Sequence, residues 1–273
     1  MSMNSFHARQ TKPRPSLQPA HERPAGMARV DVLLVQRGLA ASRTMAQRLI
    51  ESGRVACDGG VVARASLELP PAAVLTVTAD DSDRFVSRGG LKLAGALAQT
   101  GIAVAGKACL DVGQSTGGFT DCLLQAMARH VVGVDVGHDQ LHAQLRCDPA
   151  VTAIEGINCR ALTAADLGKA FPPGGFDLIV GDLSFISLTL VLPQLPPLLA
   201  AGGDMLLLVK PQFEVGPGNV GKGGIVRDAA RYGEVEAKLR QCAAHLGLAV
   251  KAWLDSPITG GDGNREFFIW LNK

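Results

Sequence analysis

A glycine-containing turn after a buried strand is the feature that most constrains the fold of this chain. Residues 109–119 (Cys-Leu-Asp-Val-Gly-Gln-Ser-Thr-Gly-Gly-Phe) predict an apolar strand ending near Asp111, a turn with three glycines and the start of a helix. Glycines permit positive φ and a close approach of the backbone to a ligand, which the first N–H groups of the helix would face. A second strand at 130–134 leads into Asp135, 24 residues after Asp111. An acidic residue at this place binds ribose hydroxyls in doubly wound folds, so the sequence predicts a nucleoside-cofactor site at the carboxyl edge of a sheet.

Other interpretations of the same turn are less consistent with the sequence. Residues 113–117 match the G-x-S-x-G pattern around the nucleophilic serine of α/β-hydrolases, here Ser115. A hydrolase needs a late histidine on a loop, but the last one, His245, falls within an expected helix. The dinucleotide fingerprint fails because Ser115 occupies its middle glycine position. A turn that only packs is a third alternative, which the position of Asp135 disfavours.

The alternation of strands and helices predicts an α/β fold with a doubly wound, Rossmann-like, mostly parallel sheet. Further strands are expected at 151–155, 176–180, 205–209, 250–254 and 266–271. Helices are expected at 120–127, 140–146, 163–170, 186–199 with breaks at its prolines, and from an Asp228 cap to 246. Because ligands bind outside the carboxyl ends of the strands, Asp182 and Lys210 belong to the rim of the site. A last strand inserted antiparallel would bring its start, Glu266, to the same rim.

The amino-terminal part predicts a small α+β module with a basic surface. Helices are expected at 29–38 and 43–52, a hairpin around Asp58-Gly59 and a short strand at 74–77. Residues 1–64 hold 10 Lys and Arg against 4 Asp and Glu, whereas the remainder holds 17 against 21. Arg43, Arg48 and Arg54 offer planar forks for phosphates, which favours a polyanion as partner. A solvated helix face is the alternative.

Composition excludes several classes of protein. No run of 18 apolar residues occurs and residues 1–26 are polar, so neither a membrane span nor a secretory signal is expected. The six cysteines form no Cys-x-x-Cys pair, which argues against disulfides and structural zinc and favours the reducing cytoplasm. Residues 216–224 nearly match a P-loop, but Gly223 replaces the hydroxyl that holds Mg²⁺, so an NTPase is not expected.

These patterns divide the chain into four expected parts. Residues 1–27 are a disordered tail, residues 28–79 the basic module, residues 80–86 a polar linker, and residues 87–273 the α/β domain.

Two sets of motifs resemble known families. The resemblance to the RNA-binding domain of ribosomal protein S4, also called the alpha-L motif, rests on residues 29–34, 41–43, 46–50 and 53–55. The similarity to the TlyA family rests on residues 86–93, 111–120, 182–187 and 209–216. That family joins the RNA-binding domain to an FtsJ-like methyltransferase domain. The resemblance implies S-adenosylmethionine-dependent 2′-O-methylation of ribosomal RNA, at cytidine, with ribosomal RNA or ribosomal subunits as partners.

The resemblance also implies the roles of single residues. The Lys-Asp-Lys-Glu tetrad of FtsJ-like enzymes falls on Lys92, Asp182, Lys210 and Glu266, with Lys210 as the expected base. A lysine serves as a base when burial or a neighbouring cation lowers its pKa toward ~7–8. Lys92 would supply that cation, whereas the two acids would orient the lysines and oppose the shift. The cofactor carries its own leaving group, so no metal is expected.

Binding residues follow from the same motifs. Cofactor contacts are expected from Asp111, Gly113, Ser115, Thr116, Gly117, Gly118, Phe119, Asp135 and Asn158. RNA contacts are expected from Arg29, Arg43, Arg48, Arg54 and Arg88. Gln114 departs from the small residue of many relatives, so the turn is expected to differ slightly.

Two other functions stay open as alternatives. A membrane-lytic protein, suggested by the haemolysin label of the family, needs an amphipathic basic helix with bulky apolar anchors, and none is evident. A ribosome-binding factor without catalysis is disfavoured by the complete tetrad.

Overall fold

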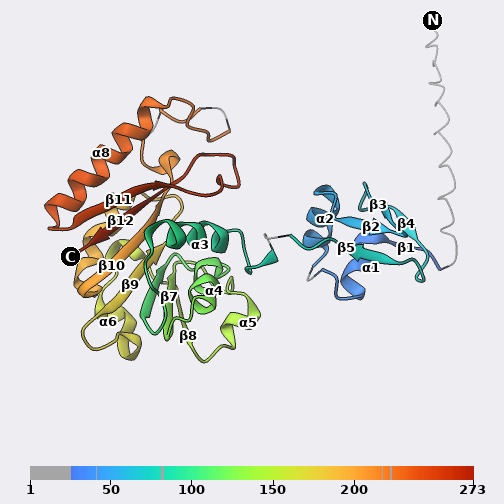
Figure 1. Cartoon of the computed structure of the whole chain (residues 1–273), viewed down its shortest axis with the longest axis horizontal. Coiled ribbons are helices and arrows are strands. Elements are labelled where there is room, and N and C mark those ends of the chain that lie inside the picture. Colours follow the sequence, from blue (N-terminus) through green and yellow to red (C-terminus); the bar gives the residue numbers. More distant parts are fainter. Residues whose placement is uncertain (1–25, 41, 81–82, 217, 222) are drawn as a thin grey trace, which may run out of the picture. The chain divides into compact units, whose positions relative to one another are not determined.

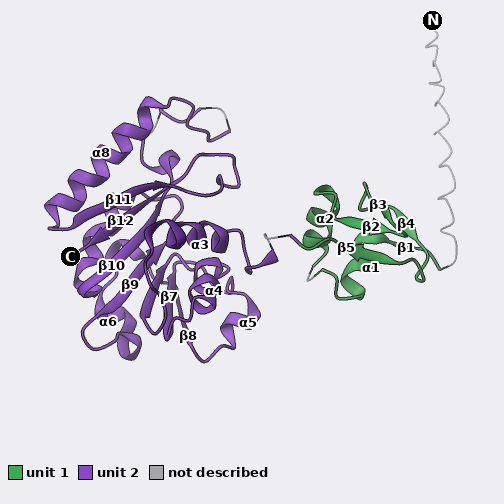
Figure 2. Ribbon diagram, viewed as in Figure 1, with its two compact units in different colours: residues 1–79 green, residues 80–273 purple. Residues whose placement is uncertain are grey.

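The computed structural model describes residues 26–40, 42–80, 83–216, 218–221 and 223–273. The chain divides between Ala79 and Asp80 into two compact units, which are coloured separately in Figure 2. Residues 1–25 of the expected tail (1–27) and residues 81 and 82 of the expected linker lie outside the described residues.

The small unit combines two helices with two small sheets (Figure 1). Its elements are β1 (Ala28–Arg29), α1 (Val30–Gln36), α2 (Arg43–Glu51), β2 (Val55–Cys57), β3 (Gly60–Val61), β4 (Glu68–Leu69) and β5 (Leu75–Val77). Strands β1 and β4 form one antiparallel sheet, and β3, β2 and β5 form the other in that order. The predicted hairpin is confirmed, because Cys57 pairs with Gly60 and both Asp58 and Gly59 have the positive φ that a two-residue turn requires.

A buried carboxylate anchors the first helix of the small unit. Asp31 is 0% exposed, and Arg29 donates to it through Nε and Nη2, each at 2.9 Å. Arg43 Nη2 donates to Asp31 Oδ2 at 3.0 Å, and Gln47 Nε2 contacts the same oxygen at 3.4 Å. Hydrogen bonds from Arg29, and then from Arg43, hold the pKa of Asp31 well below its usual range. Two arginines that the sequence predicts as RNA contacts therefore also stabilise the fold.

We expect Asp31→Asn to loosen the small unit at neutral pH more than at acid pH. An acid whose pKa folding lowers contributes stability above its unfolded pKa of about 3.9, and loses that contribution as pH falls toward its folded pKa. Hydrogen exchange of peptides from residues 28–77, corrected for intrinsic rates, should be faster in the variant at pH 7, and the difference should narrow between about pH 5 and about pH 2. Glu51→Gln changes an exposed carboxylate on α2 and is the control. Equal protection of Asp31→Asn and the wild type at pH 7 would contradict this role.

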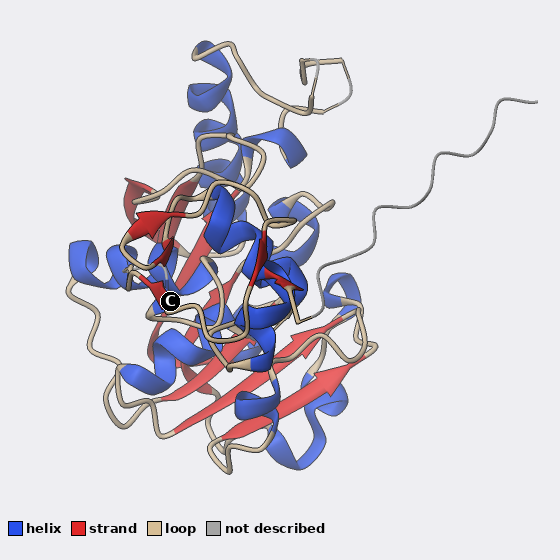
Figure 3. Ribbon diagram, turned by 90° about the vertical axis from the view of Figure 1, so that its right-hand side faces the viewer, coloured by secondary structure: helices blue, strands red, loops and turns tan. Residues whose placement is uncertain are grey.

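The large unit is built on a seven-stranded sheet with helices packed along it (Figures 1 and 3). Its strands are β6 (Ala108–Val112), β7 (His130–Asp135), β8 (Val151–Glu155), β9 (Phe176–Gly181), β10 (Leu199–Val209), β11 (Ala249–Asp255) and β12 (Phe267–Asn272). Its α-helices are α3 (Gly89–Thr100), α4 (Gly118–Gln125), α5 (Ala143–Arg146), α6 (Ala164–Leu167), α7 (Leu188–Val191) and α8 (Ala230–His245).

The strand order is β11-β12-β10-β9-β6-β7-β8. Strand β12 runs antiparallel to β10 and β11, whereas the other neighbouring pairs are parallel. This order confirms the predicted doubly wound sheet with an antiparallel last strand. After β8 the chain returns to the other side of β6 to form β9, so the strand order reverses between β6 and β9.

Both faces of the sheet are covered, which explains why its central strands are apolar at successive positions. Leu206 belongs to the core that includes Leu123 of α4, whereas its neighbour Leu207 belongs to the core that includes Leu239 of α8. Because successive side chains of a strand point to opposite faces, a strand between two helix layers needs apolar residues at both sets of positions.

The breaks expected at the prolines of 186–199 are confirmed, because this segment is the single turn α7 followed by two 3-10 turns, Leu192–Gln194 and Pro196–Leu198. Prolines lack the N–H group that a continuing helix needs. The helix expected at 140–146 is reduced to α5. Across the described ranges, no helix combines the length and the apolar character that crossing a membrane requires.

Two element boundaries also differ from those expected. Helix α8 begins after Ala229 rather than at an Asp228 cap, although Asp228 Oδ1 still accepts a hydrogen bond from Ala230 N at 3.0 Å. Strand β10 begins at Leu199 rather than at residue 205, with an irregular register against β9 between Leu199 and Asp204.

Candidate active site

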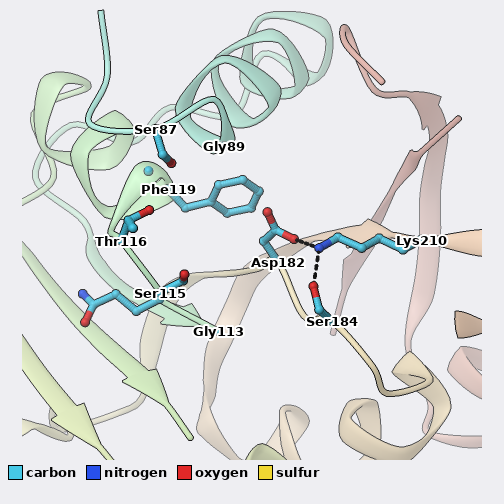
Figure 4. A pocket seen from close by; sticks show the side chains of 11 residues that line it. Ser87, Gly89, Gly113, Ser115, Thr116, Phe119, Asp182, Ser184 and Lys210 are labelled. Carbon is cyan, nitrogen blue, oxygen red and sulfur yellow. Dashed lines mark hydrogen bonds and ion pairs between the residues drawn. The ribbon is translucent and has the colours of Figure 1, made fainter. Parts of the chain in front are cut away.

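A cavity of about 180 Å³ lies at the carboxyl ends of β6, β9 and β10, where the strand order reverses. Figure 4 shows its lining, which consists of Ser87, Gly89, Gly113, Gln114, Ser115, Thr116, Gly118, Phe119, Asp182, Ser184 and Lys210. Open α/β sheets bind ligands at such a switch point. The cavity thus lies at the sheet edge where the sequence predicts a ligand.

The turn after β6 brings its backbone close to other segments. Gly113 has a φ of +86°, and a Cβ atom there would lie 2.8 Å from the carbonyl oxygen of Asp182. A Cβ atom on Gly118 would collide with Ser87 Oγ. Both positions therefore exclude larger side chains and leave backbone as the wall of the cavity. Gly118 also begins α4, whose first N–H groups have no carbonyl partners within the helix.

Asp135 and Asn158, both expected near the cofactor, do not line this cavity. Asp135 Oδ2 accepts a hydrogen bond from Ser115 N at 2.8 Å, and its Oδ1 accepts one from Gly137 N at 2.7 Å. Asp135 thereby holds the turn in place, and each oxygen keeps capacity for a further donor such as a hydroxyl. Asn158 is exposed and caps a 3-10 turn, since its Oδ1 accepts a hydrogen bond from Arg160 N at 3.0 Å.

Asp111 lies beneath the turn and also does not line the cavity. It is 0% exposed, Thr120 Oγ1 donates to its Oδ2 at 2.7 Å, and Gln114 Nε2 donates to Thr120 Oγ1 at 2.9 Å. Burial raises the pKa of Asp111 to about 7, and the Thr120 hydrogen bond opposes the rise. Gln114 thus completes a buried network that supports the turn.

Lys210 and Asp182 meet at the rim of the cavity. Lys210 Nζ lies 2.6 Å from Asp182 Oδ1 and donates to Ser184 Oγ at 2.8 Å (Figure 4). The side chains of Lys210 and Asp182 are 12% and 21% exposed, so the ion pair is largely withdrawn from water. Asp182 follows β9 and Lys210 follows β10, and these strands are parallel neighbours, so their ends lie side by side.

A second ion pair joins Lys92 to Glu266. Lys92 Nζ, in the first turn of α3, lies 2.6 Å from Glu266 Oε2, directly before β12, and both side chains are less than 10% exposed. Burial raises the pKa of Glu266, whereas the ammonium groups of Lys92 and Lys210 lower it and the Asp182 carboxylate raises it. Glu266 thus interacts electrostatically with both members of the first pair, although Lys92 and Glu266 do not themselves line the cavity.

The arginines of the small unit expected to contact RNA differ in their surroundings. Arg29 and Arg43 are engaged by the buried Asp31. Arg54 donates to the carbonyl oxygen of Thr78, at 2.9 Å from Nε and 2.7 Å from Nη2. Arg48 is exposed on α2, and within the described residues its guanidinium has no hydrogen bond or ion pair. Arg48 is thus the arginine of this set most available to a phosphate.

Arg88, the expected RNA contact in the large unit, directly precedes α3. Its Nη2 donates to the carbonyl oxygen of Thr259 at 3.0 Å, so it links the start of α3 to the loop before Glu266.

Sequence reasoning gave no role to three residues at this site. Ser184 accepts the hydrogen bond from Lys210, and Ser87 lines the cavity. Phe185 is 90% exposed with a φ of +63°, and its ring centroid lies 5.1 Å from that of Phe213. Ser184 has a weak sequence signal, because it follows Asp182 in the same motif. Phe185 stands near apolar residues in the sequence, which predicts a buried side chain, whereas the structure exposes it.

The geometry does not support the other chemistries weighed from the sequence. Ser115 Oγ donates to Gln140 Oε1 at 3.2 Å rather than to a histidine, so it lacks the partner of a hydrolase nucleophile. Within the part of the chain that the structure describes, no three His, Cys, Asp or Glu side chains gather as a metal site requires.

Comparisons with known proteins show similarity over nearly the whole chain. The family model of FtsJ-like methyltransferases matches residues 85–273, and that of S4 domains matches residues 28–75. The 16S/23S rRNA (cytidine-2′-O)-methyltransferase TlyA of Mycobacterium tuberculosis is 47% identical over 250 residues, 90% of each chain. Hemolysin A of Brachyspira hyodysenteriae is 36% identical over 239 residues, 88% of this chain and 97% of the relative. The solved structure of a candidate hemolysin from Streptococcus thermophilus is 38% identical, covers 92% of this chain and 90% of its own, and has a TM-score of 0.70.

Proposed function

This chain belongs to the FtsJ-like methyltransferase family, and on that premise we propose that it transfers a methyl group from S-adenosylmethionine to a ribose 2′-hydroxyl of ribosomal RNA, at cytidine. The observation that carries the proposal is the ion pair of Lys210 with Asp182 in the wall of a cavity at the switch point of the sheet, together with a second buried pair, Lys92 with Glu266, whose carboxyl group interacts electrostatically with both members of the first. The name of the Mycobacterium tuberculosis relative, which matches over 90% of each chain, supports the substrate class.

The two lysines provide what methylation of a ribose hydroxyl needs. A hydroxyl is a poor nucleophile and must lose its proton as its oxygen forms the new bond to carbon. The neutral amine of Lys210, which Asp182 Oδ1 at 2.6 Å and Ser184 Oγ at 2.8 Å hold at the cavity rim, receives that proton and becomes an ammonium group. The ammonium group of Lys92 stabilises the negative charge that develops on the oxygen, and Glu266 fixes its position. When bound, S-adenosylmethionine supplies an electrophilic methyl group on a sulfonium that leaves as a neutral thioether.

The residues around the cavity fit such a cofactor. Gly113 and Gly118, which have no room for a Cβ atom, present backbone to the cavity, and Thr116 and Phe119 also line it (Figure 4). Asp135, at the tip of β7, has oxygens that can accept ribose hydroxyls. We assign cofactor binding to this turn together with the end of β7.

The small unit is proposed to bind ribosomal RNA or a ribosomal subunit. Its match to the S4 domain and the open guanidinium of Arg48 support a phosphate-binding role. Since ribosomes are cytoplasmic, the proposed reaction takes place there.

Phe185 is proposed to stack on the base of the target nucleotide. An aromatic ring that is 90% exposed, three residues after Asp182, offers a face to an unstacked base near the cavity. A stacked base contributes about 1–3 kcal/mol, so Phe185→Ala should raise the apparent KM for RNA by about tenfold or more, while Phe185→Tyr should restore it. Filter binding and steady-state kinetics measure the effect, with Met127→Ala, another exposed apolar residue of the large unit, as control. An unchanged KM for RNA in Phe185→Ala would exclude the stacking role.

Mass spectrometry of ribosomal RNA tests the function itself. RNA incubated with the protein and S-adenosylmethionine should gain 14 mass units on a cytidine ribose, at a site that untreated RNA lacks. Binding of RNA without methyl transfer would instead identify a non-catalytic ribosome-binding factor. Leakage of dye from liposomes in the absence of methylation would favour the lytic alternative.

A further inference from the structure

The buried carboxylate of Glu214, to which the sequence assigned no role, joins two segments that each carry catalytic groups. Its side chain is 1% exposed. Ser187 Oγ donates to Glu214 Oε2 at 2.6 Å, and Leu188 N donates to Oε1 at 2.6 Å. Lys238 Nζ, from α8, donates to Oε2 at 2.9 Å and to the Glu214 carbonyl oxygen at 3.0 Å. Every donor comes from outside the segment that bears Glu214.

The two segments, residues 182–188 after β9 and residues 210–214 after β10, touch in matching order. Lys210, the first residue of its segment, contacts Asp182 and Ser184. Further along, the ring of Phe213 lies 5.1 Å from that of Phe185. The last contact is that of Glu214 with Ser187 and Leu188. The contact between the two segments thus begins at Lys210, the expected base, and ends at Glu214.

A tight turn connects Lys210 rigidly to Glu214. Phe213 N donates to the Lys210 carbonyl oxygen at 3.0 Å, and the N–H groups of Glu214 and Val215 donate to the Pro211 carbonyl oxygen at 2.9 and 3.0 Å. A change in the position of Glu214 therefore moves the backbone that carries Lys210.

We propose that Glu214 is a positioning residue for methyl transfer, holding Lys210 at the distance from Asp182 and Ser184 at which its amine can accept the ribose proton. The proposal rests on the proposed function of the same site. Misplacement of a reacting group by about 1 Å can lower a rate about a hundredfold, whereas binding at a separate place is spared. Neither Glu214 nor its partners line the cavity. Loss of Glu214 should thus reduce the rate of the chemical step and leave cofactor affinity unchanged.

The test is a comparison of Glu214→Ala with Glu214→Gln in the full-length protein. In Glu214→Ala, Leu188 N loses its carboxylate partner, whereas Ser187 Oγ keeps its contact with Thr189 Oγ1 at 2.8 Å. Single-turnover methyl transfer should fall about 10- to 100-fold, while the dissociation constant for S-adenosylmethionine stays within about twofold of the wild type. Glu214→Gln keeps an acceptor for Leu188 N, and Lys238, whose side chain is 41% exposed, can turn to solvent. This variant should recover most of the rate.

Asp204→Ala is the matched control, because it removes another carboxylate that holds β10. Asp204 lies in the middle of β10, six residues before Lys210, where Trp270 Nε1 donates to it at 2.8 Å and Lys107 Nζ lies 3.8 Å away. The control should lose thermal stability and keep its rate per folded molecule. A wild-type rate of methyl transfer in Glu214→Ala would overturn the positioning role. So would an equal loss of rate in Glu214→Ala and Asp204→Ala, after each rate is divided by the fraction of folded protein. The wild-type rate tests the proposed function separately, since a wild type without methyl transfer refutes that function whatever the variants do.

Discussion

Lys210→Ala is expected to lower single-turnover methyl transfer by at least about a thousandfold, and this is the largest effect that the site predicts. Without the amine, the proposed acceptor of the ribose proton is missing from the cavity rim, where Lys210 Nζ contacts Asp182 and Ser184. Cofactor binding should persist, since most of the cavity wall comes from the turn after β6. Rapid-quench assays with labelled S-adenosylmethionine measure the rate, and isothermal titration measures the binding.

Lys210→Arg separates the proton acceptor from the positive charge. Arginine keeps the charge and reaches Asp182, but it does not lose its proton at any pH at which the protein is folded. The arginine variant should therefore be as inactive as the alanine variant. The control for loss of a surface charge is Lys169→Ala, which removes an exposed lysine that does not line the cavity. Substantial activity in Lys210→Arg would show that charge, not proton transfer, is the contribution of Lys210.

The sequence was most informative about the sheet, because the determinants there are local. Apolar runs set the strands, and the residues that follow the strands, such as Asp182 and Lys210, could be assigned to one rim from strand direction alone. The position of Glu266 also followed once the last strand was taken as antiparallel, which the register of β12 against β10 confirms.

Side-chain partners across the fold were beyond sequence reasoning. Arg43 reads as an exposed helix residue, yet it reaches back twelve positions to a buried Asp31. Asp31 itself reads as an ordinary acid in the first turn of a helix, and its burial depends on how α1 packs against α2. Likewise, the contacts of Glu214 with Ser187 and Leu188, 27 and 26 residues away, exist only because β9 and β10 are neighbours.

Backbone conformation explains the remaining difference at the site. Phe185 adopts a positive φ that non-glycine residues rarely take, and this turns an apolar ring toward solvent. No periodicity in the sequence predicts such a position. The sequence was therefore least informative about the loop that carries Phe185, where the backbone conformation and not a residue pattern sets the side-chain direction.

Glu266→Leu should be the most destabilising of the substitutions at the tetrad. The side chain of Lys92 is 9% exposed, so removal of its partner leaves an ammonium group buried without a counter-charge. Breaking a buried ion pair in this way costs about 3–5 kcal/mol, which chemical unfolding followed by the fluorescence of Trp253 and Trp270, both in the large unit, can measure. Activity should fall as well, because Lys92 is no longer held in place.

The double variant Lys92→Met with Glu266→Leu separates stability from catalysis. Replacing both charges by apolar groups of similar size should restore most of the unfolding free energy lost in Glu266→Leu, but methyl transfer should stay low because the second ammonium group is absent. Lys92→Met alone should be milder than Glu266→Leu at low pH, because burial already raises the pKa of Glu266 and a protonated carboxyl group can remain buried. When the pKa of an acid is raised by folding, the folded protein loses stability as pH increases and the buried acid ionises. The free energy of unfolding of Lys92→Met should therefore be lower at about pH 8 than at about pH 5. Full activity in the double variant would show that the Lys92–Glu266 pair serves the fold and not the reaction.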